Sequence, residues 1–351
     1  MRLPESLNNI TKKLFPGYFA SVMATGIVSI ASFLTGHKAL SDFLFIAANV
    51  FYVILILGYL LRLALFRKET WTDMTNAAKV FGYFTFVAGS DVLATRYSLA
   101  GDYQAALWLG VVALIAWTLM NYFILTFMVF YNEQPITKAL NGTWLLATVS
   151  AQSLSIVSLI GIHTLPTHRS LLILLSVSFW AFGVVIYLIF IALIIYRYFF
   201  HVTKPSDMTP PYWINMGAMA ITTLAGAHLV LAAPTAPILT MLQPFMEGFT
   251  ILLWVWGTWW IPFLFIVGFW KYVLDREPVR YDPALWSMVF PLGMYTTACD
   301  TMSKIPGLGL IHSFVTVGLW IAIASWFMVA VLFLVKNKSS ERQQSPQKAM
   351  R

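Results

Sequence analysis

Hydroxyl side chains recur at helical spacing in several apolar segments of this chain. Ser21, Thr25 and Ser29 stand at positions i, i+4 and i+8, which places them on one narrow stripe of a helix. Similar stripes in later segments add the candidates Thr148, Gln152, Ser155, Thr222 and Ser287. Such groups can donate hydrogen bonds to an anion without holding it tightly, so they suit the wall of a hydrated path. The alternative is that they bond carbonyl groups of their own helices or mediate helix packing.

Phe290 and Pro291 form the most specific local feature of the sequence. A proline inside a helix removes one backbone hydrogen bond and kinks the chain. A phenylalanine directly before such a kink, on a helix that lines a path, can close that path as a hydrophobic constriction. The alternative is an ordinary core residue among 27 phenylalanines.

Few ionisable residues lie inside the apolar segments, and these are candidates for an electrostatic or proton-coupling role. They are Asp91 and Arg96 in one segment and Asp300 and Lys304 at the end of another. The i, i+4 spacing of Asp300 and Lys304 permits a salt bridge on one helix face. These residues form either structural ion pairs or an outer vestibule that attracts anions.

Histidine and cysteine give little indication of catalysis. His228 stands alone in its segment and is either a packing residue or a proton-coupling group, and Cys299 is interpreted as a small packing residue. His163 and His168 share a loop without a carboxylate or cysteine at ligand spacing, so we expect no metal site. No phosphate-binding loop, nucleophile elbow, zinc-protease or dinucleotide motif occurs, so we expect neither an enzyme nor a cofactor.

The elements that carry these residues are membrane-spanning helices. Of the 351 residues 59% are hydrophobic and only 10% are charged, whereas soluble domains average about 25% charged residues. Crossing the hydrocarbon layer takes about 20 apolar residues. The sequence therefore predicts an all-α integral membrane protein with ten spans. They are residues 15–35, 43–61, 79–98, 103–131, 142–165, 171–196, 211–231, 249–270, 283–302 and 310–335.

The predicted spans alternate in character along the chain. Odd-numbered spans are rich in Gly, Ala, Ser and Thr, whereas even-numbered spans are bulky, apolar and hold ten of the fourteen tryptophans. An aromatic residue stands near the start of each odd span, and Phe19, Phe84 and Trp213 are taken as pore-lining candidates. This pattern predicts five helical hairpins in a quasi-five-fold arrangement around a central pore, with the odd helices inside. A dense bundle without a pore is the alternative.

Charge placement predicts the orientation in the membrane. All but four of the 22 Lys and Arg residues fall on one side of the predicted spans, so both termini are expected in the cytoplasm. Residues 1–14 form a cytoplasmic segment, 15–335 the membrane domain and 336–351 a polar tail expected to be disordered. We expect a multi-pass plasma-membrane protein without a cleavable signal peptide. An excess of basic residues that reflects orientation in the membrane does not indicate a nucleic-acid partner.

Two stretches of the chain resemble a known family. Residues 15–30, FPGYFASVMATGIVSI, resemble the first helix of the tellurite-resistance/dicarboxylate transporter family, and residues 286–295, WSMVFPLGMY, resemble its ninth helix. The family includes tellurite-resistance permeases, malate permease, a sulfite efflux pump and plant slow anion channels.

The resemblance implies ten helices around a pore in each subunit of a homotrimer. It also implies that a phenylalanine of the ninth helix occludes the conduit, and Phe290 matches that position. An unpaired acid in such a pore repels anions. We therefore expect Arg96 and Lys304 to neutralise Asp91 and Asp300, or both acids to face away from the path.

The expected function is membrane transport of small anions such as C4-dicarboxylates, sulfite, nitrate or chloride through a pore gated by Phe290. A proton-coupled, alternating-access carrier or exporter of dicarboxylate, tellurite or sulfite is the nearest alternative. A membrane sensor or structural protein without a pore is the alternative from a different class.

Overall fold

The computed structural model describes residues 5–348 and consists of helices and connecting turns, with no strand among the described residues. A helix satisfies its own backbone hydrogen bonds, which an apolar chain in lipid requires. The α-helices are α1 (Glu5–Lys12), α2 (Ala20–Leu34), α3 (Lys38–Leu65), α4 (Arg67–Met74), α5 (Phe84–Leu99), α6 (Tyr103–Phe130), α7 (Ile136–Ala139), α8 (Leu146–Ile160), α9 (Arg169–Phe200), α10 (Ile214–Ala232), α11 (Pro237–Phe269), α12 (Trp286–Met302) and α13 (Ser313–Lys348).

Short helical turns precede or follow several of these helices. They are η1 (Val80–Tyr83), η2 (Gly142–Leu145), η3 (Gly161–His163), η4 (Pro166–His168), η5 (Pro205–Asp207), η6 (Pro210–Trp213), η7 (Ala233–Thr235), η8 (Trp270–Leu274), η9 (Pro283–Leu285) and η10 (Gly309–His312). Four of them, η1, η2, η6 and η9, lead directly into α5, α8, α10 and α12.

Seven helical stretches of the described chain are long and apolar enough to cross a bilayer, whereas the sequence analysis expects ten spans. The shortfall falls on the first, third and ninth predicted spans. α2 holds only 15 residues, and a helix of this length is about 22 Å long, which is less than the hydrocarbon thickness. Residues 80–99 (η1 and α5) and 283–302 (η9 and α12) are long enough, but polar residues such as Asp91, Arg96 and Asp300 lower their hydropathy. All three segments are largely buried by neighbouring helices, so they need not be apolar enough to face lipid.

The predicted alternation between buried and exposed spans is confirmed. The most apolar windows of residues 142–163 and 210–235, which hold α8 and α10, are 78% and 83% buried within the protein. The corresponding windows of α3 and α6 are each 22% buried, and that of residues 309–336 in α13 is 17% buried. Small and hydroxylated side chains let helix backbones approach closely, whereas bulky apolar side chains are compatible with lipid.

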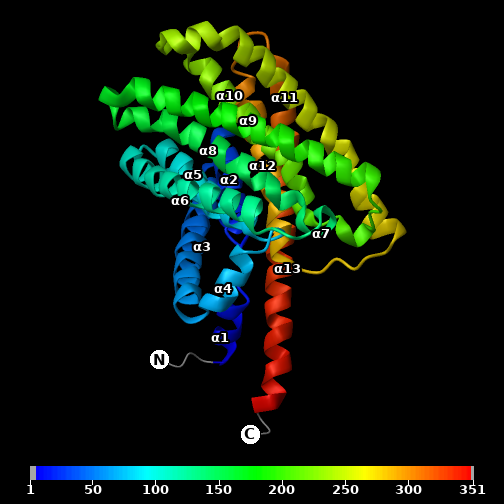
Figure 1. Ribbon diagram of the computed structural model, residues 1–351. Coiled ribbons are helices and arrows are strands. Elements are labelled where there is room, and N and C mark those ends of the chain that lie inside the picture. Colours follow the sequence, from blue (N-terminus) through cyan, green and yellow to red (C-terminus); the bar gives the residue numbers. More distant parts are fainter. Residues whose placement is uncertain (1–4, 349–351) are drawn as a thin grey trace.

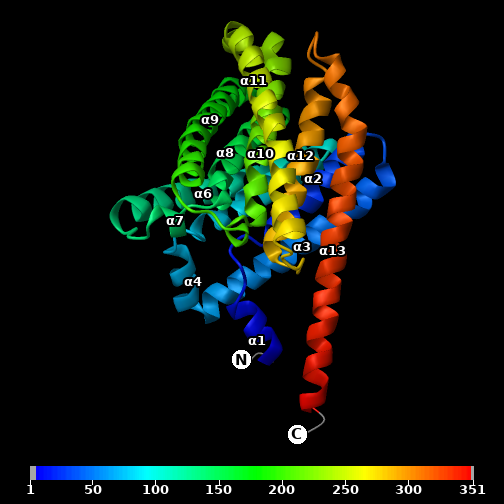
Figure 2. The same cartoon turned by 90° about the vertical axis from the view of Figure 1, so that its right-hand side faces the viewer.

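The buried helices contact one another in a closed order. α2 packs against α5, α5 against α8, α8 against α10, α10 against α12, and α12 returns to α2. Each of them also packs against the helix that follows it in the chain, as α2 does with α3 and α12 with α13. Figure 2 shows α10, α12 and α13 running alongside one another. We call α2, α5, α8, α10 and α12 the inner helices and α3, α6, α9, α11 and α13 the outer helices.

Both ends of the chain lie at the same end of the molecule, and α13 extends beyond the other helices there (Figures 1 and 2). The structure continues α13 to Lys348. The disorder expected of residues 336–351 stays a prediction. Residues 349–351 lie outside the described part of the chain.

The tryptophans only partly follow the expected pattern, in which those on outer helices face lipid. Trp108 and Trp320 of the outer helices are exposed to 61% and 54%, as expected for a lipid-facing surface. Trp180 and Trp260, also on outer helices, are only 4% exposed. The indole of Trp180 donates a hydrogen bond of 3.1 Å to the carbonyl of Thr222. An indole N–H requires an acceptor, and the neighbouring inner helix supplies one.

Gly142 sits where the approach to α8 meets the approach to α10. A Cβ atom at this position would overlap the backbone carbonyl group of Pro211 in η6. Backbone atoms cannot move aside as the end of a flexible side chain can, so a glycine is required for this contact.

Gly142→Ala should therefore lower the melting temperature of the purified protein, by an amount equivalent to about 1–3 kcal/mol of overpacking. The matched control is Gly248→Ala in α11, where no atom lies within 4 Å of the added Cβ atom. That substitution should leave stability unchanged or slightly raised, because alanine is the better helix former. Equal melting temperatures for the two variants would contradict the proposed contact.

Candidate functional site

Phe290 is enclosed where α12 packs between α10 and α2. Its side chain is 1% exposed. A Cβ atom on Gly217 of α10 would lie 2.8 Å from Cγ of Pro291, and one on Gly293 would lie 2.8 Å from Cγ2 of Ile27 in α2. Two glycines therefore let the neighbouring helices close tightly around this part of α12. The proline leaves the carbonyl of residue 287, one turn earlier, without its usual helical donor.

Two of the predicted pore-lining serines bond outer helices instead. The hydroxyl of Ser29 donates to the carbonyl of Ser41 in α3 at 2.7 Å, and the hydroxyl of Ser41 donates back to the carbonyl of Ser29 at 2.7 Å. Ser155 donates to the carbonyl of Ser176 in α9 at 2.8 Å. These groups join an inner helix to its outer partner. The pore-lining role of Ser29 and Ser155 stays a prediction.

Thr25 and Gln152 make a similar connection. Nε1 of Trp326 in α13 donates to the hydroxyl of Thr25 at 3.0 Å. Nε2 of Gln152 donates to the carbonyl of Trp180 in α9 at 3.0 Å, and Gln152 packs against Gly183 of the same helix. Both side chains therefore contact outer helices.

Other hydroxyl groups bond the backbone of their own segment. Thr222 donates to the carbonyl of Ala218 at 2.6 Å, and Ser21 donates to the carbonyl of Tyr18 at 2.9 Å. These contacts agree with the alternative interpretation of the stripes, in which hydroxyl groups satisfy a carbonyl one turn earlier.

A smaller set of buried polar atoms has no hydrogen-bond partner among the described residues. They include the hydroxyl oxygens of Thr148 in α8 and Thr223 in α10, Oε1 of Gln152 and Oδ1 of Asp91. Ser287 in α12 is 7% exposed, and no hydrogen bond of its hydroxyl is found. These atoms lie on four of the inner helices. The pore-lining role of Thr148 and Ser287 stays a prediction.

The predicted aromatic positions fall at contacts between helices. Phe19 packs against Tyr52 and Tyr59 of α3, with ring centroids 5.7 and 5.4 Å apart. Trp213 packs edge-to-face against Phe265 of α11 at 5.7 Å. Phe19 also packs edge-to-face against Phe86 of the inner helix α5, with ring centroids 5.1 Å apart. The pore-lining role of Phe19 and Trp213 stays a prediction.

Phe84 is the remaining aromatic candidate. Its side chain is 1% exposed, and its ring centroid lies 6.3 Å from that of Phe81 in η1. Its role in lining a path stays a prediction.

Arg96 pairs with Asp42, and not with Asp91 as the sequence analysis expects. Its Nη2 atom lies 2.7 Å from Oδ1 of Asp42 at the start of α3, and its Nε atom bonds the hydroxyls of Ser29 and Ser41 at 3.1 and 3.2 Å. The guanidinium group, 2% exposed, thus joins α2, α3 and α5. Asp91 instead contacts the hydroxyl of Ser153 in α8 at 2.6 Å.

The second expected ion pair is confirmed. Nζ of Lys304 lies 2.7 Å from Oδ2 of Asp300, at the predicted i, i+4 spacing. His312 of η10 also approaches this carboxylate, with Nδ1 4.0 Å from Oδ1. Lys304 therefore compensates the charge of Asp300.

The histidines show no ligand-binding arrangement. His228 lies partly buried in α10, and its proton-coupling role stays a prediction. His163 stacks on Tyr103, with ring centroids 4.4 Å apart. Within residues 5–348, no three His, Cys, Asp or Glu side chains gather closely enough to hold a metal ion.

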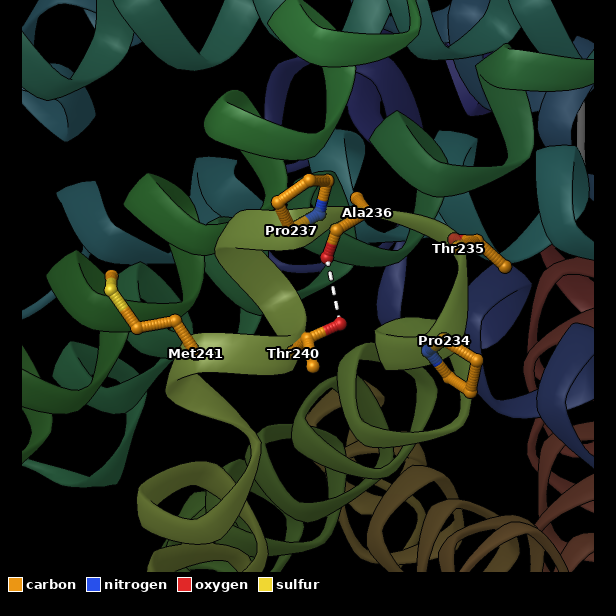
Figure 3. Close-up of a pocket in the computed structure, with 6 residues that line it drawn as sticks. All are labelled: Pro234, Thr235, Ala236, Pro237, Thr240 and Met241. Carbon is orange, nitrogen blue, oxygen red and sulfur yellow. Dashed lines mark hydrogen bonds between the residues drawn. The ribbon is translucent and has the colours of Figure 1, made fainter.

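A surface hollow lies at the turn between α10 and α11 (Figure 3). The hydroxyl of Thr240 closes this turn, with the carbonyl oxygens of Ala233 and Ala236 2.8 and 3.2 Å away as alternative acceptors. Pro234, Pro237 and Met241 complete its lining. No predicted site residue lines this hollow, so we do not assign the candidate site to it.

Arg96→Lys should destabilise the protein by about 1–3 kcal/mol. A lysine ammonium cannot reproduce the planar guanidinium, whose separate N–H groups reach Asp42, Ser29 and Ser41 at once. Thermal unfolding in detergent measures the loss. Arg280→Lys provides the control, because Arg280 is exposed and carries the same substitution. Similar melting temperatures for Arg96→Lys and Arg280→Lys would show that the planar guanidinium contributes nothing.

Comparison with known proteins places the geometry in context. A family model described as voltage-dependent anion channel matches residues 13–334. Two uncharacterised transporters of Methanocaldococcus jannaschii are 26% and 24% identical to the chain; the alignments cover 93% and 95% of this chain and 94% and 98% of theirs. An uncharacterised membrane protein of Mycobacterium tuberculosis is 39% identical over 143 residues, 41% of this chain and 72% of its own. The resemblance noted in residues 15–30 and 286–295 is thereby confirmed, and the chain belongs to the voltage-dependent anion channel family, the tellurite-resistance/dicarboxylate transporters.

Proposed function

We propose that the chain conducts small anions along the axis of its five inner helices, with the ten inner and outer helices crossing the plasma membrane as five hairpins. The observation that carries this proposal is the closed order of contacts among buried helices, with Phe290 enclosed beside Pro291 inside α12. Membership of a family of membrane anion transporters supports the same function.

Electrostatics supports an anion as the substrate. Asp300 is paired with Lys304, so its negative charge is compensated. Unpartnered hydroxyls such as those of Thr148 and Thr223 can supply hydrogen-bond donors to a passing anion. Weak, neutral donors favour conduction, since an ion that binds tightly leaves slowly. The substrates to compare are malate, sulfite, nitrate and chloride. Cytoplasmic termini and assembly as a homotrimer are part of the proposal.

Phe290→Ala should raise anion flux several-fold in proteoliposomes, because the shorter side chain opens the constriction. Flux of each anion is measured against a potential set by a potassium gradient. Phe127→Ala in outer helix α6 is the matched control, since Phe127 is also buried, at 7% exposure. An unchanged flux for folded Phe290→Ala protein would count against the gate. No flux of any anion, in the wild type or the variant, would favour a sensor or structural role.

Asp91 favours a second candidate function, proton-coupled transport. The hydroxyl of Ser153 lies 2.6 Å from Oδ2 of Asp91 and 2.9 Å from the carbonyl of Ser150. A hydroxyl has one proton and cannot donate to both acceptors. If Asp91 carries a proton, it donates to Ser153, which in turn donates to Ser150, and both contacts are satisfied. Asp91 forms no ion pair in the described residues, so a proton bound to it would neutralise an otherwise uncompensated charge.

Asp91→Asn should abolish uptake driven by a pH gradient if Asp91 carries the coupled proton, because the amide cannot release one. Uptake is measured in proteoliposomes with the membrane potential clamped to zero. Asp300→Asn serves as the control, since Asp300 is paired with a lysine and should not be needed for coupling. Wild-type protein that shows no response to the pH gradient, or an Asp91→Asn variant that keeps it, would exclude this mechanism.

A further inference from the structure

A basic cavity of about 390 Å³ lies at the end of the molecule that holds both termini, where α1, the last turns of α3 and α4 meet (Figure 1). Four cationic side chains and two carboxylates line it. They are Lys12, Lys13, Arg62, Lys79, Glu69 and Asp73. The cavity therefore has an excess of two positive charges, and it lies outside the inner ring.

Arg62 is buried in this cavity, with a side chain only 3% exposed. Its Nη2 atom lies 2.5 Å from Oδ2 of Asp73, while its Nε and Nη1 atoms make no well-formed hydrogen bond in the described residues, and the hydroxyl of Tyr83 is the polar group of the protein nearest to them. Asp73 also accepts a bond of 2.7 Å from Lys79, so one carboxylate serves two cations. A buried guanidinium with unused donors is costly unless an acceptor is supplied.

The other residues of the cavity do not balance its charge. Glu69 pairs with Lys12 at 3.1 Å, and its own backbone amide and Lys12 lower the pKa of its carboxyl. Its single charge thus compensates Lys12. Lys13 makes no ion pair in the described residues and remains available to a ligand. An occupant with two negative charges would neutralise the remaining excess of two positive charges in the cavity.

The cavity stands at the level expected for lipid headgroups. Leu60, Leu63 and Leu65, in the last turns of α3 beside Arg62, are exposed to 59%, 53% and 48%. Such apolar side chains belong in the hydrocarbon layer, and basic residues directly beside them lie where phosphate groups are found. Trp71 of α4, 59% exposed, agrees with an interfacial position.

The cavity also touches the entry to the first inner helix. Phe15 and Pro16, which lead into α2, form part of its lining. The hydroxyl of Tyr59 in α3 donates to the carbonyl of Phe15 and holds this segment against α3. An occupant of the cavity therefore contacts both α3 and the start of the chain that enters the ring.

We propose that this cavity binds a phosphate group, of an anionic phospholipid headgroup or of a soluble phosphorylated compound, through Lys13, Lys79 and the unused donors of Arg62. Arginine and lysine are the residues that recognise phosphate most often, and a doubly charged phosphate matches the charge excess. Binding stabilises the packing of residues 12–16 against α3 and α4.

The test measures melting temperature of the full chain, so its result does not depend on transport. In one arm, protein in phosphatidylcholine nanodiscs is titrated with inorganic phosphate against chloride at equal ionic strength. In the other arm, phosphatidic acid replaces part of the phosphatidylcholine. A ligand that binds the folded state raises the melting temperature in a saturable manner. A response in the first arm identifies soluble phosphate, and a response in the second alone identifies the lipid headgroup.

Lys13→Gln is the deciding variant, because Lys13 lines the cavity without an ion pair whose loss would disturb the fold. It should reduce the ligand-induced shift by at least half. Lys38→Gln, an exposed lysine at the opposite end of α3, should leave the shift unchanged. Arg62→Lys should reduce the shift further but also disturbs Asp73. No saturable shift in either arm, or equal shifts in Lys13→Gln and Lys38→Gln, would overturn the proposal.

Discussion

Within the hydrocarbon layer, a polar side chain must find its hydrogen-bond partner inside the protein, and this requirement organises the structure. Ser29 with Ser41 and Ser155 with Ser176 join inner helices to outer ones. Trp326 with Thr25 and Gln152 with Trp180 add connections of the same kind. The lipid-facing surface is left to apolar side chains, and the inner helices can carry polar residues because outer helices cover them.

Much of the fold could be predicted from hydropathy and small-residue content. These quantities depend on composition within one segment, so they predict which helices are buried and which face lipid. The Asp300–Lys304 ion pair could also be predicted from the sequence, because both residues lie on one helix at i, i+4. The short length of α2, 15 residues, was not predictable, since it depends on neighbours that replace lipid around it.

The candidate site was less predictable for a related reason. A stripe such as Ser21, Thr25 and Ser29 defines one face of a helix but not the neighbour that the face meets. Arg96 and Asp42 are 54 residues apart on different helices, and no local spacing signals their pairing. Phe290 stands out in the sequence because of its proline neighbour and the family resemblance. Its tight enclosure depends on Gly217 and Gly293, which let neighbouring helices approach α12 closely, and this contact is not visible in the sequence.

The contact between the first inner helix and the last outer helix has a consequence for biosynthesis. Thr25 and Trp326 are separated by 301 residues, and α2 also packs against α12. A ribosome that adds roughly 5–20 residues per second takes tens of seconds to supply these partners. Until then, the flank of α2 that they cover has no permanent neighbour in the membrane. A chain truncated before α12 therefore leaves the flanks of α2 and α10 that pack against α12 uncovered.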